Sequence, residues 1–230
     1  MYVTAIVPAA GEGSRFGRSV RKQFIGLDGL PILSHTLRAL EASGALAAMI
    51  VVVPPGEESA GQDAIRAAGV AIETEVVSGG QERQDSVYNG LKRAKPETDL
   101  VLIHDGVRPF VSREVILAAI GAAQEWGAAV TAVPVTDTIK RVDSQGLVLD
   151  TPERGQLWAA QTPQVFRYSL LLQAHQAGRG HGIVATDDAA LMERIGVKAK
   201  IVRGSYENLK ITSEEDLPFA ELILRRRMPG

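Results

Sequence analysis

The residues best suited to anion chemistry stand near the start of the chain, in PAAGEGSRFGRSVRKQF, residues 8–24. This stretch holds three glycines and four cationic side chains, and it directly follows the apolar run VTAIV. Cations crowded into one turn repel each other unless an anion or solvent separates them. Phosphate can be bound by the backbone N–H groups of such a turn together with nearby cations. We therefore predict a site for a phosphate-rich ligand, with a plain glycine-rich turn as the alternative.

The glycine spacing departs from two common nucleotide-binding motifs. A dinucleotide-binding fingerprint requires G-x-G-x-x-G, and Gly11 and Gly13 fit its first two positions. The third position is Phe16, and Gly17 comes one residue late. The second predicted strand ends in Pro54-Pro55, where a ribose-binding acid would be expected, and a Walker A sequence is absent. A dinucleotide-binding oxidoreductase is therefore the disfavoured alternative.

Three further groups carry candidate chemistry. HDGVRPF, residues 104–110, follows the run LVLI, and its Asp105 can hold Mg²⁺ beside phosphates or merely cap the next turn. NLKIT places Lys210 at the end of a predicted late strand, where a lysine is otherwise ordinary surface. GGQERQDSV, residues 79–87, sets two glycines before a predicted helix that contains Ser86, and it can equally be a capped turn.

Strands and helices alternate along the chain that must position these groups. The run 3–8 is β-branched and bounded by proline, as in a buried strand, and Leu33, Leu37 and Leu40 share one face of a predicted helix. The predicted strands are 3–8, 49–54, 72–77, 99–105 and 128–135, and the predicted helices are 31–44, 61–69, 83–94, 112–127 and 212–227. This alternation indicates an α/β fold with a largely parallel sheet, which binds ligands at the carboxyl ends of its strands.

Composition excludes several classes of function. The formal net charge of −2 gives no basic field to recruit nucleic acid. The chain has no cysteine, so disulfides, thiolate catalysis and cysteine-ligated metals are excluded, and a reducing cytoplasm is the expected location. The longest apolar run, residues 45–53, is too short to span a bilayer, so we expect no membrane partner.

One segment breaks the alternation. Residues 136–158 alternate roughly in twos around DSQG, which predicts a β-hairpin with a glycine-containing loop. An isolated two-stranded hairpin is marginal in water. A partner subunit is a natural surface for it to pack on, so we expect a homodimer joined through this arm.

Taken together, these motifs resemble the 2-C-methyl-D-erythritol 4-phosphate cytidylyltransferases of the non-mevalonate isoprenoid pathway. The matching segments span nearly the whole chain in the family's order: PAAGEGSRF, KQF, GGQERQDSV, HDGVRPF, VPVTDTIKR, LWAAQTPQVF, TDDA and NLKIT. The resemblance implies a single Rossmann-like nucleotidyltransferase domain over residues 1–230, with the arm at about 136–158 inserted. Ribitol-5-phosphate cytidylyltransferases share most of these motifs and are the alternative, although DTIKR and LWAAQTPQ look closer to the methylerythritol enzymes.

The resemblance also implies a reaction and a set of site residues. A phosphate oxygen of the acceptor attacks the α-phosphorus of CTP, Mg²⁺ assists, and Asp105 holds the metal. The implied catalytic residues are Arg15, Lys22 and Lys210. The implied CTP-binding residues are Pro8, Ala9, Ala10, Gly11, Gly13, Gly80, Ser86 and Asp105. The implied acceptor-binding residues are Arg108, Thr138, Arg154, Thr162 and Thr186, of which Thr138 and Arg154 come from the neighbouring subunit's arm.

Some roles stay open at this point. Gln81 stands where some relatives carry aspartate, so a side-chain contact to the base is undecided there. Thr186 can bind the acceptor or cap a helix. A non-catalytic nucleotide-binding protein would keep the glycine turns, but it would not need both Arg15 and Lys22.

Overall fold

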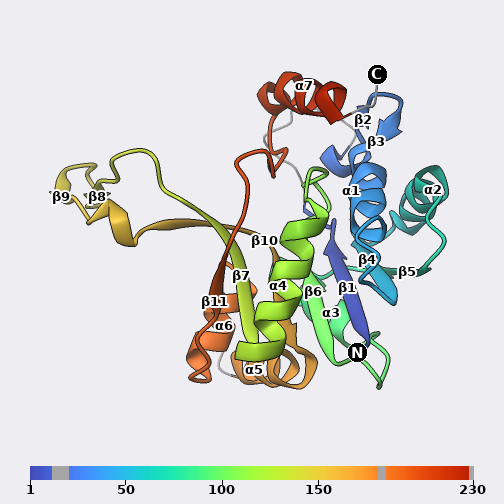
Figure 1. Cartoon of the computed structure of the whole chain (residues 1–230), viewed down its shortest axis with the longest axis horizontal. Helices are drawn as coiled ribbons and strands as arrows, with labels where there is room; N and C mark the ends of the chain where they lie inside the picture. The colour runs from blue at the N-terminus through green and yellow to red at the C-terminus, as the bar shows by residue number, and fades with distance from the viewer. Residues whose placement is uncertain (12–20, 181–184, 228–230) are drawn as a thin grey trace.

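The computed structural model describes residues 1–11, 21–180 and 185–227, and its described strands form a seven-stranded sheet with two short two-stranded pairs. The order in the main sheet is β11-β7-β10-β6-β1-β4-β5 (Figure 1). These strands are β1 (Val3–Pro8), β4 (Ala48–Val53), β5 (Glu73–Ser78), β6 (Leu100–Ile103), β7 (Ala128–Pro134), β10 (Trp158–Arg167) and β11 (Lys200–Arg203). Only β10 runs antiparallel to its neighbours in this sheet. The expected α/β fold with a mostly parallel sheet is confirmed.

Helices cover both faces of the sheet. They are α1 (Ile32–Glu41), α2 (Glu58–Ala68), α3 (Arg83–Leu91), α4 (Arg113–Trp126), α5 (Tyr168–Gly180) and α6 (Asp188–Arg194). The last helix, α7 (Leu217–Arg227), packs in a separate apolar cluster with Ile25, Leu27 and Ile211. Residues of α1, α2 and α4 pack in one apolar cluster and residues of α3, α5 and α6 in another. The central strands touch both clusters, which explains why β1, β4 and β6 read as continuous apolar runs instead of alternating ones.

The sheet changes its winding direction at β1. The chain proceeds from β1 through β4 to β5 on one side, and then returns to place β6 against the other side of β1. In open α/β sheets, ligands bind beyond the carboxyl ends of the strands near such a point, which here is the end of β1 and β6. The backbone N–H of Gly106 donates to the carbonyl of Pro8 at 3.0 Å, so the two strand ends stay close.

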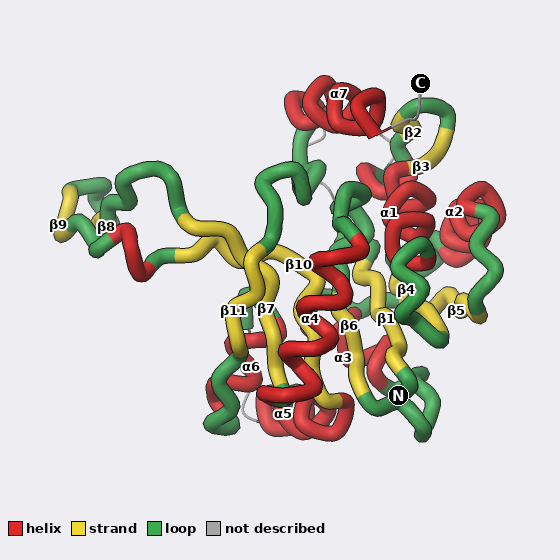
Figure 2. The backbone as a smooth tube through the Cα atoms, in the orientation of Figure 1, coloured by secondary structure: helices red, strands yellow, loops and turns green. Residues whose placement is uncertain are grey.

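The segment that interrupts the alternation projects away from the body (Figure 2). Its tip is a short antiparallel pair, β8 (Arg141–Val142) with β9 (Val148–Asp150), and Gly146 in the connecting loop has a φ of 83°. A short 3₁₀ helix (Arg154–Gln156) leads back into β10. The predicted hairpin with a glycine-containing loop is therefore confirmed.

Two local expectations were wrong. Lys210 does not end a late strand, because the last strand, β11, closes at Arg203 and Lys210 follows a turn. The helix predicted over 212–227 is instead a 3₁₀ turn (Glu214–Asp216) followed by α7, and a capping box formed by Ser213 and Asp216 opens it. The Asp216 carboxylate accepts from both the Thr212 and the Ser213 backbone N–H, which selects this register.

Candidate active site

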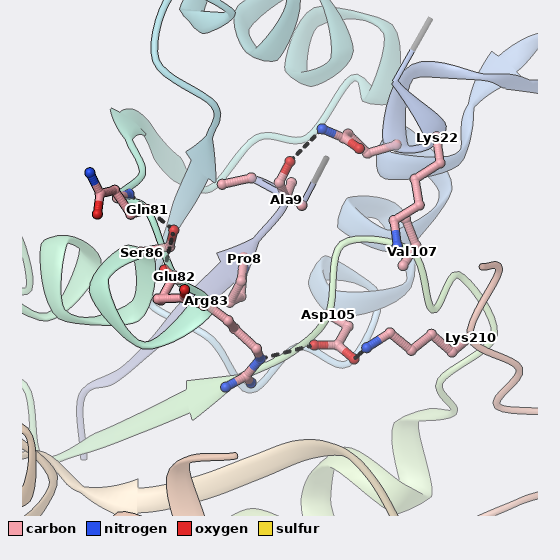
Figure 3. Close-up of a pocket in the computed structure, with 14 residues that line it drawn as sticks. Pro8, Ala9, Lys22, Gln81, Glu82, Arg83, Ser86, Asp105, Val107 and Lys210 are labelled. Atoms are coloured by element: carbon pink, nitrogen blue, oxygen red, sulfur yellow. Dashed lines mark hydrogen bonds and ion pairs between the residues drawn. The ribbon is translucent and has the colours of Figure 1, made fainter. Parts of the chain in front are cut away.

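A cavity opens at the carboxyl ends of β1 and β6 (Figure 3). Its lining brings together five segments: the end of β1, the 3₁₀ turn η2 (Lys22–Phe24), the start of α3, the loop after β6, and the loop that carries Lys210. The lining residues are Pro8, Ala9, Ala10, Gly11, Lys22, Gln23, Gly80, Gln81, Glu82, Arg83, Ser86, Asp105, Val107 and Lys210. All the described residues that were predicted to bind CTP therefore line one cavity.

The turn before α3 is held tightly. The Gly79 backbone N–H donates to the Val53 carbonyl at 2.7 Å, and the Gly80 N–H donates to the Ser86 hydroxyl at 3.1 Å. The Ser86 hydroxyl itself donates to the Glu82 carbonyl at 3.2 Å. Since its proton is engaged, Ser86 offers a ligand only an acceptor lone pair.

Asp105 stands among three cations (Figure 3 shows two of them). Its Oδ2 lies 3.0 Å from Lys210 Nζ and 3.4 Å from Arg108 Nε, and its Oδ1 lies 3.7 Å from Arg83 Nε. Only 9% of its side-chain surface is exposed. Burial by itself raises the pKa of the Asp105 carboxyl, but the charges of Lys210, Arg83 and Arg108 outweigh it and hold the pKa well below its usual range. Asp105 is therefore ionised, and the three cations outnumber it, as an anion site requires.

A buried histidine fixes the loop that carries Asp105. Burial lowers the pKa of His104 to about 4, so its ring is neutral at pH 7. Its Nε2 must donate to the Arg108 carbonyl, 3.0 Å away, and its Nδ1 therefore accepts from the Thr162 hydroxyl at 3.1 Å. The Thr162 oxygen also accepts from the Asp105 backbone N–H at 3.0 Å. Thr162 can thus offer an acceptor substrate a lone pair but no proton.

A second cavity adjoins the first. It is lined by Arg83, Asp105, Arg108, Ala160, Gln161, Thr162, Gln164, Thr186, Asp187 and Lys210. Three of the predicted acceptor-binding residues, Arg108, Thr162 and Thr186, lie here together. The helix-cap alternative for Thr186 is wrong, because the N-cap of α6 is Asp187, whose side chain accepts from the Ala190 N–H.

The remaining predicted site residues lie elsewhere or outside the described ranges. Gly13 and Arg15 belong to residues 12–20, which the structure does not describe. Thr138 and Arg154 are exposed on the arm, and of the two described cavities neither includes them. Arg154 has a local partner that the sequence did not reveal, because its Nη1 donates to the Thr136 carbonyl at 2.7 Å.

Two of the lining residues that the sequence did not predict, Gln23 and Arg83, lie in the motifs KQF and GGQERQDSV. Gln23 is fully buried and donates from Nε2 to the Ala9 carbonyl at 2.5 Å, which fixes the end of β1. Arg83 is the first residue of α3, where the helix dipole disfavours a cation. An arginine at that position signals nearby carboxylates, and the structure supplies Asp105 and Asp188.

The donors present fit one mode of metal binding. Among the described residues, no group of three or more histidines and carboxylates could hold a metal ion by itself. Mg²⁺ commonly binds one or two carboxylates together with substrate phosphates and water. Asp105, ionised and facing the cavity, can supply one such ligand.

Comparison with known proteins gives one consistent result. Residues 3–226 match the family model described as IspD: 2-C-methyl-D-erythritol 4-phosphate cytidylyltransferase. The chain is 49% identical to the protein of that name from Pelotomaculum thermopropionicum, over 98% of this chain and 95% of the relative. It is 50% identical to the one from Desulforamulus reducens, over 98% and 97%.

Solved structures agree with these sequence matches. The 4-diphosphocytidyl-2C-methyl-D-erythritol synthase from Anaerococcus prevotii has a TM-score of 0.87 and 33% identity, with 98% of this chain and 96% of that chain covered. The 2-C-methyl-D-erythritol 4-phosphate cytidylyltransferase from Thermus thermophilus has a TM-score of 0.81 and 34% identity, with 98% and 100% covered.

Proposed function

Because the chain belongs to the 2-C-methyl-D-erythritol 4-phosphate cytidylyltransferase family, and is therefore a nucleotidyltransferase, we propose that the two adjoining cavities bring CTP and methylerythritol phosphate together for direct transfer. A phosphate oxygen of the acceptor forms a bond to the α-phosphorus of CTP, and the bond from that phosphorus to the oxygen bridging to the β-phosphorus breaks. The products are 4-diphosphocytidyl-2-C-methyl-D-erythritol and pyrophosphate.

One observation carries this proposal. Arg83, Asp105 and Lys210 line both cavities, so the two binding spaces meet at a shared pair of cations with one carboxylate between them. Two polyanions repel each other, and a cationic junction is what can hold their phosphates in contact. A dinucleotide-binding oxidoreductase has no use for such a junction between two separate anion sites.

The attacking phosphate oxygen is already an anion, so the reaction needs no general base. Stabilisation of the charge that develops on phosphorus and on the leaving pyrophosphate is what remains for the protein to provide. Lys22 enters the first cavity from η2, and Lys210 reaches Asp105 from the side opposite Arg83 (Figure 3). We assign both, with Arg15, to phosphate binding in the transition state.

The nucleotide would occupy the first cavity. Its triphosphate would lie at Pro8, Ala9, Ala10 and Gly11 together with Gly13, and its base at the turn that contains Gly80. Cytosine presents an exocyclic amine where uracil presents a carbonyl, so a selective site needs acceptors there. Backbone carbonyls near Ala9 and Gly80 and the free lone pair of Ser86 meet that need.

The acceptor would occupy the second cavity. Arg108 and Lys210 are suited to its phosphate, and the lone pairs of Thr162 and Thr186 to its hydroxyl groups. In a homodimer joined through the arm, Thr138 and Arg154 of the second subunit would complete this cavity. The lack of cysteine agrees with action in the cytoplasm.

Asp105 would hold Mg²⁺ in the enzyme–CTP complex. The bound ion would neutralise part of the phosphate charge. For Asp105 to serve as a ligand, Lys210 or Arg83 must turn from the carboxylate to the arriving phosphates. Asp105→Asn should therefore raise the Mg²⁺ concentration for half-maximal rate more than it raises the KM for CTP in saturating metal. An unchanged Mg²⁺ titration would indicate that Asp105 has a purely structural role.

The decisive experiment measures pyrophosphate release by the purified protein. CTP with methylerythritol phosphate should be turned over, while UTP or ribitol 5-phosphate in place of either substrate should be much poorer. Leaving a buried acceptor against the uracil carbonyl costs about 1–3 kcal/mol per unsatisfied group. Ser86→Ala should narrow the preference for CTP, and Gln81→Ala should change it little. Equal turnover of ribitol 5-phosphate would instead favour the alternative acceptor.

A further inference from the structure

Arg83 lies at the junction of the two cavities, and a carboxylate that lines neither cavity binds its guanidinium group. Its Nη1 donates to Asp188 Oδ2 at 2.7 Å, while its Nε lies 3.7 Å from Asp105 Oδ1 on the cavity side. The guanidinium is planar and rigid, so two contacts on different nitrogens determine its orientation as well as its place.

Asp188 is itself held by a second buried group. Its side chain is 1% exposed, and its Oδ1 accepts from Nε2 of His175 at 3.0 Å. His175 lies on α5 with no exposed side-chain surface, and the ring of Tyr88 stacks against it with centroids 6.1 Å apart. The carboxylate therefore has one oxygen directed to His175 and the other to Arg83, and it cannot turn without breaking one of these bonds.

The surrounding elements are locked to the same place. Gln164 of β10 donates to the Asp187 carboxylate at 2.8 Å, and Gln84 of α3 accepts from the Ala185 N–H at 3.0 Å. These bonds tie the start of α6 to β10 and to α3, the helix that carries Arg83. A functional group held on rigid elements by a second set of bonds keeps a more precise position than one on a free loop.

Stability alone gives a weak reason for this arrangement. A buried ion pair is often no more stabilising than apolar residues of the same volume, because both ions lose their hydration. Arg83 also opens α3, where the helix dipole opposes a positive charge. Burial lowers the pKa of Arg83, yet the charges of Asp188 and Asp105 outweigh it and raise that pKa above its usual value. The arginine is therefore fully charged at a place that is costly for the fold and adjacent to the reacting groups.

We propose that Asp188 and His175 are positioning residues that hold the Arg83 guanidinium at the junction of the two cavities, where Arg83 contacts the reacting phosphates of CTP and the acceptor. This inference rests on the proposed cytidylyl transfer. Arg83 then has a catalytic role. Asp188 and His175, which line neither cavity, affect the rate only through Arg83.

The test is a double-mutant cycle with Arg83→Gln and Asp188→Asn. Arg83→Gln should lower kcat/KM at least 30-fold, and Asp188→Asn about tenfold. The double variant should be no worse than Arg83→Gln within about twofold, because Asp188 acts through the arginine. Arg93→Gln is the matched control, since Arg93 pairs with Glu75 on the exposed surface, and it should keep wild-type kinetics. Losses that simply multiply, or wild-type kinetics in Arg83→Gln, would overturn the proposal.

Two further variants separate positioning from folding. Arg83→Lys keeps the charge but loses the fork that Asp188 orients, so it should stay impaired in kcat while melting close to the wild type. His175→Phe keeps an aromatic ring and the ion pair but removes the donor to Asp188, so it should lower kcat with little change in either KM. A purely structural role would instead lower the melting temperature and leave kcat per folded molecule unchanged in both variants.

Failure of the proposed function would be recognised separately. If the wild-type protein releases no pyrophosphate from CTP and methylerythritol phosphate, the same cycle is measured on binding affinity by calorimetry. The probes are CTP and cytidine, which differ by the phosphates. Arg83→Gln and Asp188→Asn should then weaken CTP binding non-additively and leave cytidine binding unchanged. Additive effects, or equal losses for both probes, would contradict the positioning role.

Discussion

At the residue scale, the site is organised around one carboxylate and the cations that face it. Asp105 lies at the end of β6, and its three partners come from α3, from its own turn and from a loop about a hundred residues later. The carboxylate keeps these cations near each other despite their mutual repulsion. Arriving phosphates can replace it as their partner, so the site is pre-arranged for anions and needs little rearrangement.

Lys22 gives the most direct test of cation-based catalysis. Lys22→Ala should lower turnover about 10²–10³-fold, roughly 3–4 kcal/mol, as does the loss of one donor to a developing anion. Arg15→Ala should behave alike, although residue 15 lies outside the described ranges. Steady-state kinetics with both substrates measure the effect. Lys95→Ala, which alters an exposed pair with Glu73, should be neutral. Near-normal turnover in both active-site variants would contradict a catalytic role for Lys22 and Arg15.

His104 should make the fold sensitive to mild acid. Its pKa is about 4 in the folded protein and 6.5 when unperturbed, so between these values the unfolded chain binds a proton that the folded protein does not. The stability contributed by the neutral ring is complete above pH 6.5 and is lost as the pH falls to about 4. At 1.36 kcal/mol per pKa unit the loss is about 3 kcal/mol.

Urea unfolding at several pH values from 7 to 4 tests this expectation. His104→Gln keeps a donor for the Arg108 carbonyl but has no ring that titrates. Because it lacks the stability contributed by the neutral ring, it should be less stable than the wild type at pH 7. Its stability should then fall less steeply as the pH decreases, and the two profiles should converge. Carboxyl groups whose pKa is lowered in the folded state, such as Asp188, contribute equally to both proteins and cancel when the two stability profiles are subtracted. Parallel profiles would mean that His104 is not the titrating group.

At the scale of elements, the position of α3 depends on close contact with its neighbours. Gly79 and Gly80 lead into this helix between the ends of β1 and β4, and Gly90 lies against β1. A Cβ at residue 90 would come within 2.7 Å of Ile6 Cγ2, so only glycine lets the helix lie so close to the sheet. The same closeness brings Ser86 and Arg83 to the cavity.

Gly79→Ala should disturb both stability and nucleotide binding. Its Cβ would lie 2.7 Å from Ala10 Cβ and 2.8 Å from Ser86 Oγ, so the turn must shift, at a cost of about 1–3 kcal/mol for such overpacking. Gly121→Ala on α4 is the control: open space surrounds that position, and alanine should stabilise the helix by about 0.5–1 kcal/mol. Urea unfolding and CTP calorimetry measure the two effects. Unchanged CTP affinity in a destabilised Gly79→Ala variant would show that this turn does not contact the base.

At the scale of the whole molecule, the arm is the feature that a single chain leaves unexplained. It carries apolar side chains that are 38–62% exposed, namely Ile139, Val142, Leu147, Val148, Leu149 and Trp158. Within the described residues, no helix is long and apolar enough to cross a membrane. Exposed apolar surface of this kind suits contact with a second protein, and a second copy of the chain is the partner that would also bring Thr138 and Arg154 to a substrate cavity.

Mixed dimers test whether each arm serves the opposite subunit. The homodimers of Arg154→Ala and of Lys22→Ala should both be nearly inactive. After subunit exchange, half the dimers are mixed, and each mixed dimer has one site with both defects and one with neither. Activity should therefore rise to about a quarter of the wild-type value. Activity no higher than the mean of the two parents, with exchange demonstrated, would place Arg154 in its own subunit's site.

The sequence by itself determined the order of the elements and the chemistry at their ends. Apolar runs, proline and glycine boundaries and helical periodicity depend on neighbours in the chain, so β1, β4, β6 and the helices between them could be predicted locally. So could the N-cap of α4 at Ser112 and the hairpin of the arm. The motifs also predicted that Lys22, Asp105 and Ser86 belong to one nucleotide site, because their residue types and order are specific to one family, and the structure brings the three to one cavity.

Only the tertiary structure decided which of these groups meet and how. The antiparallel strand β10 is inserted between β6 and β7, and Lys210 reaches Asp105 from a loop and not from a strand. The link from Arg83 to Asp188 joins residues 105 positions apart, and that from His104 to Thr162 joins residues 58 apart. Local spacing carries no information about such contacts, since they form only when the sheet and both helical layers pack and exclude water around them.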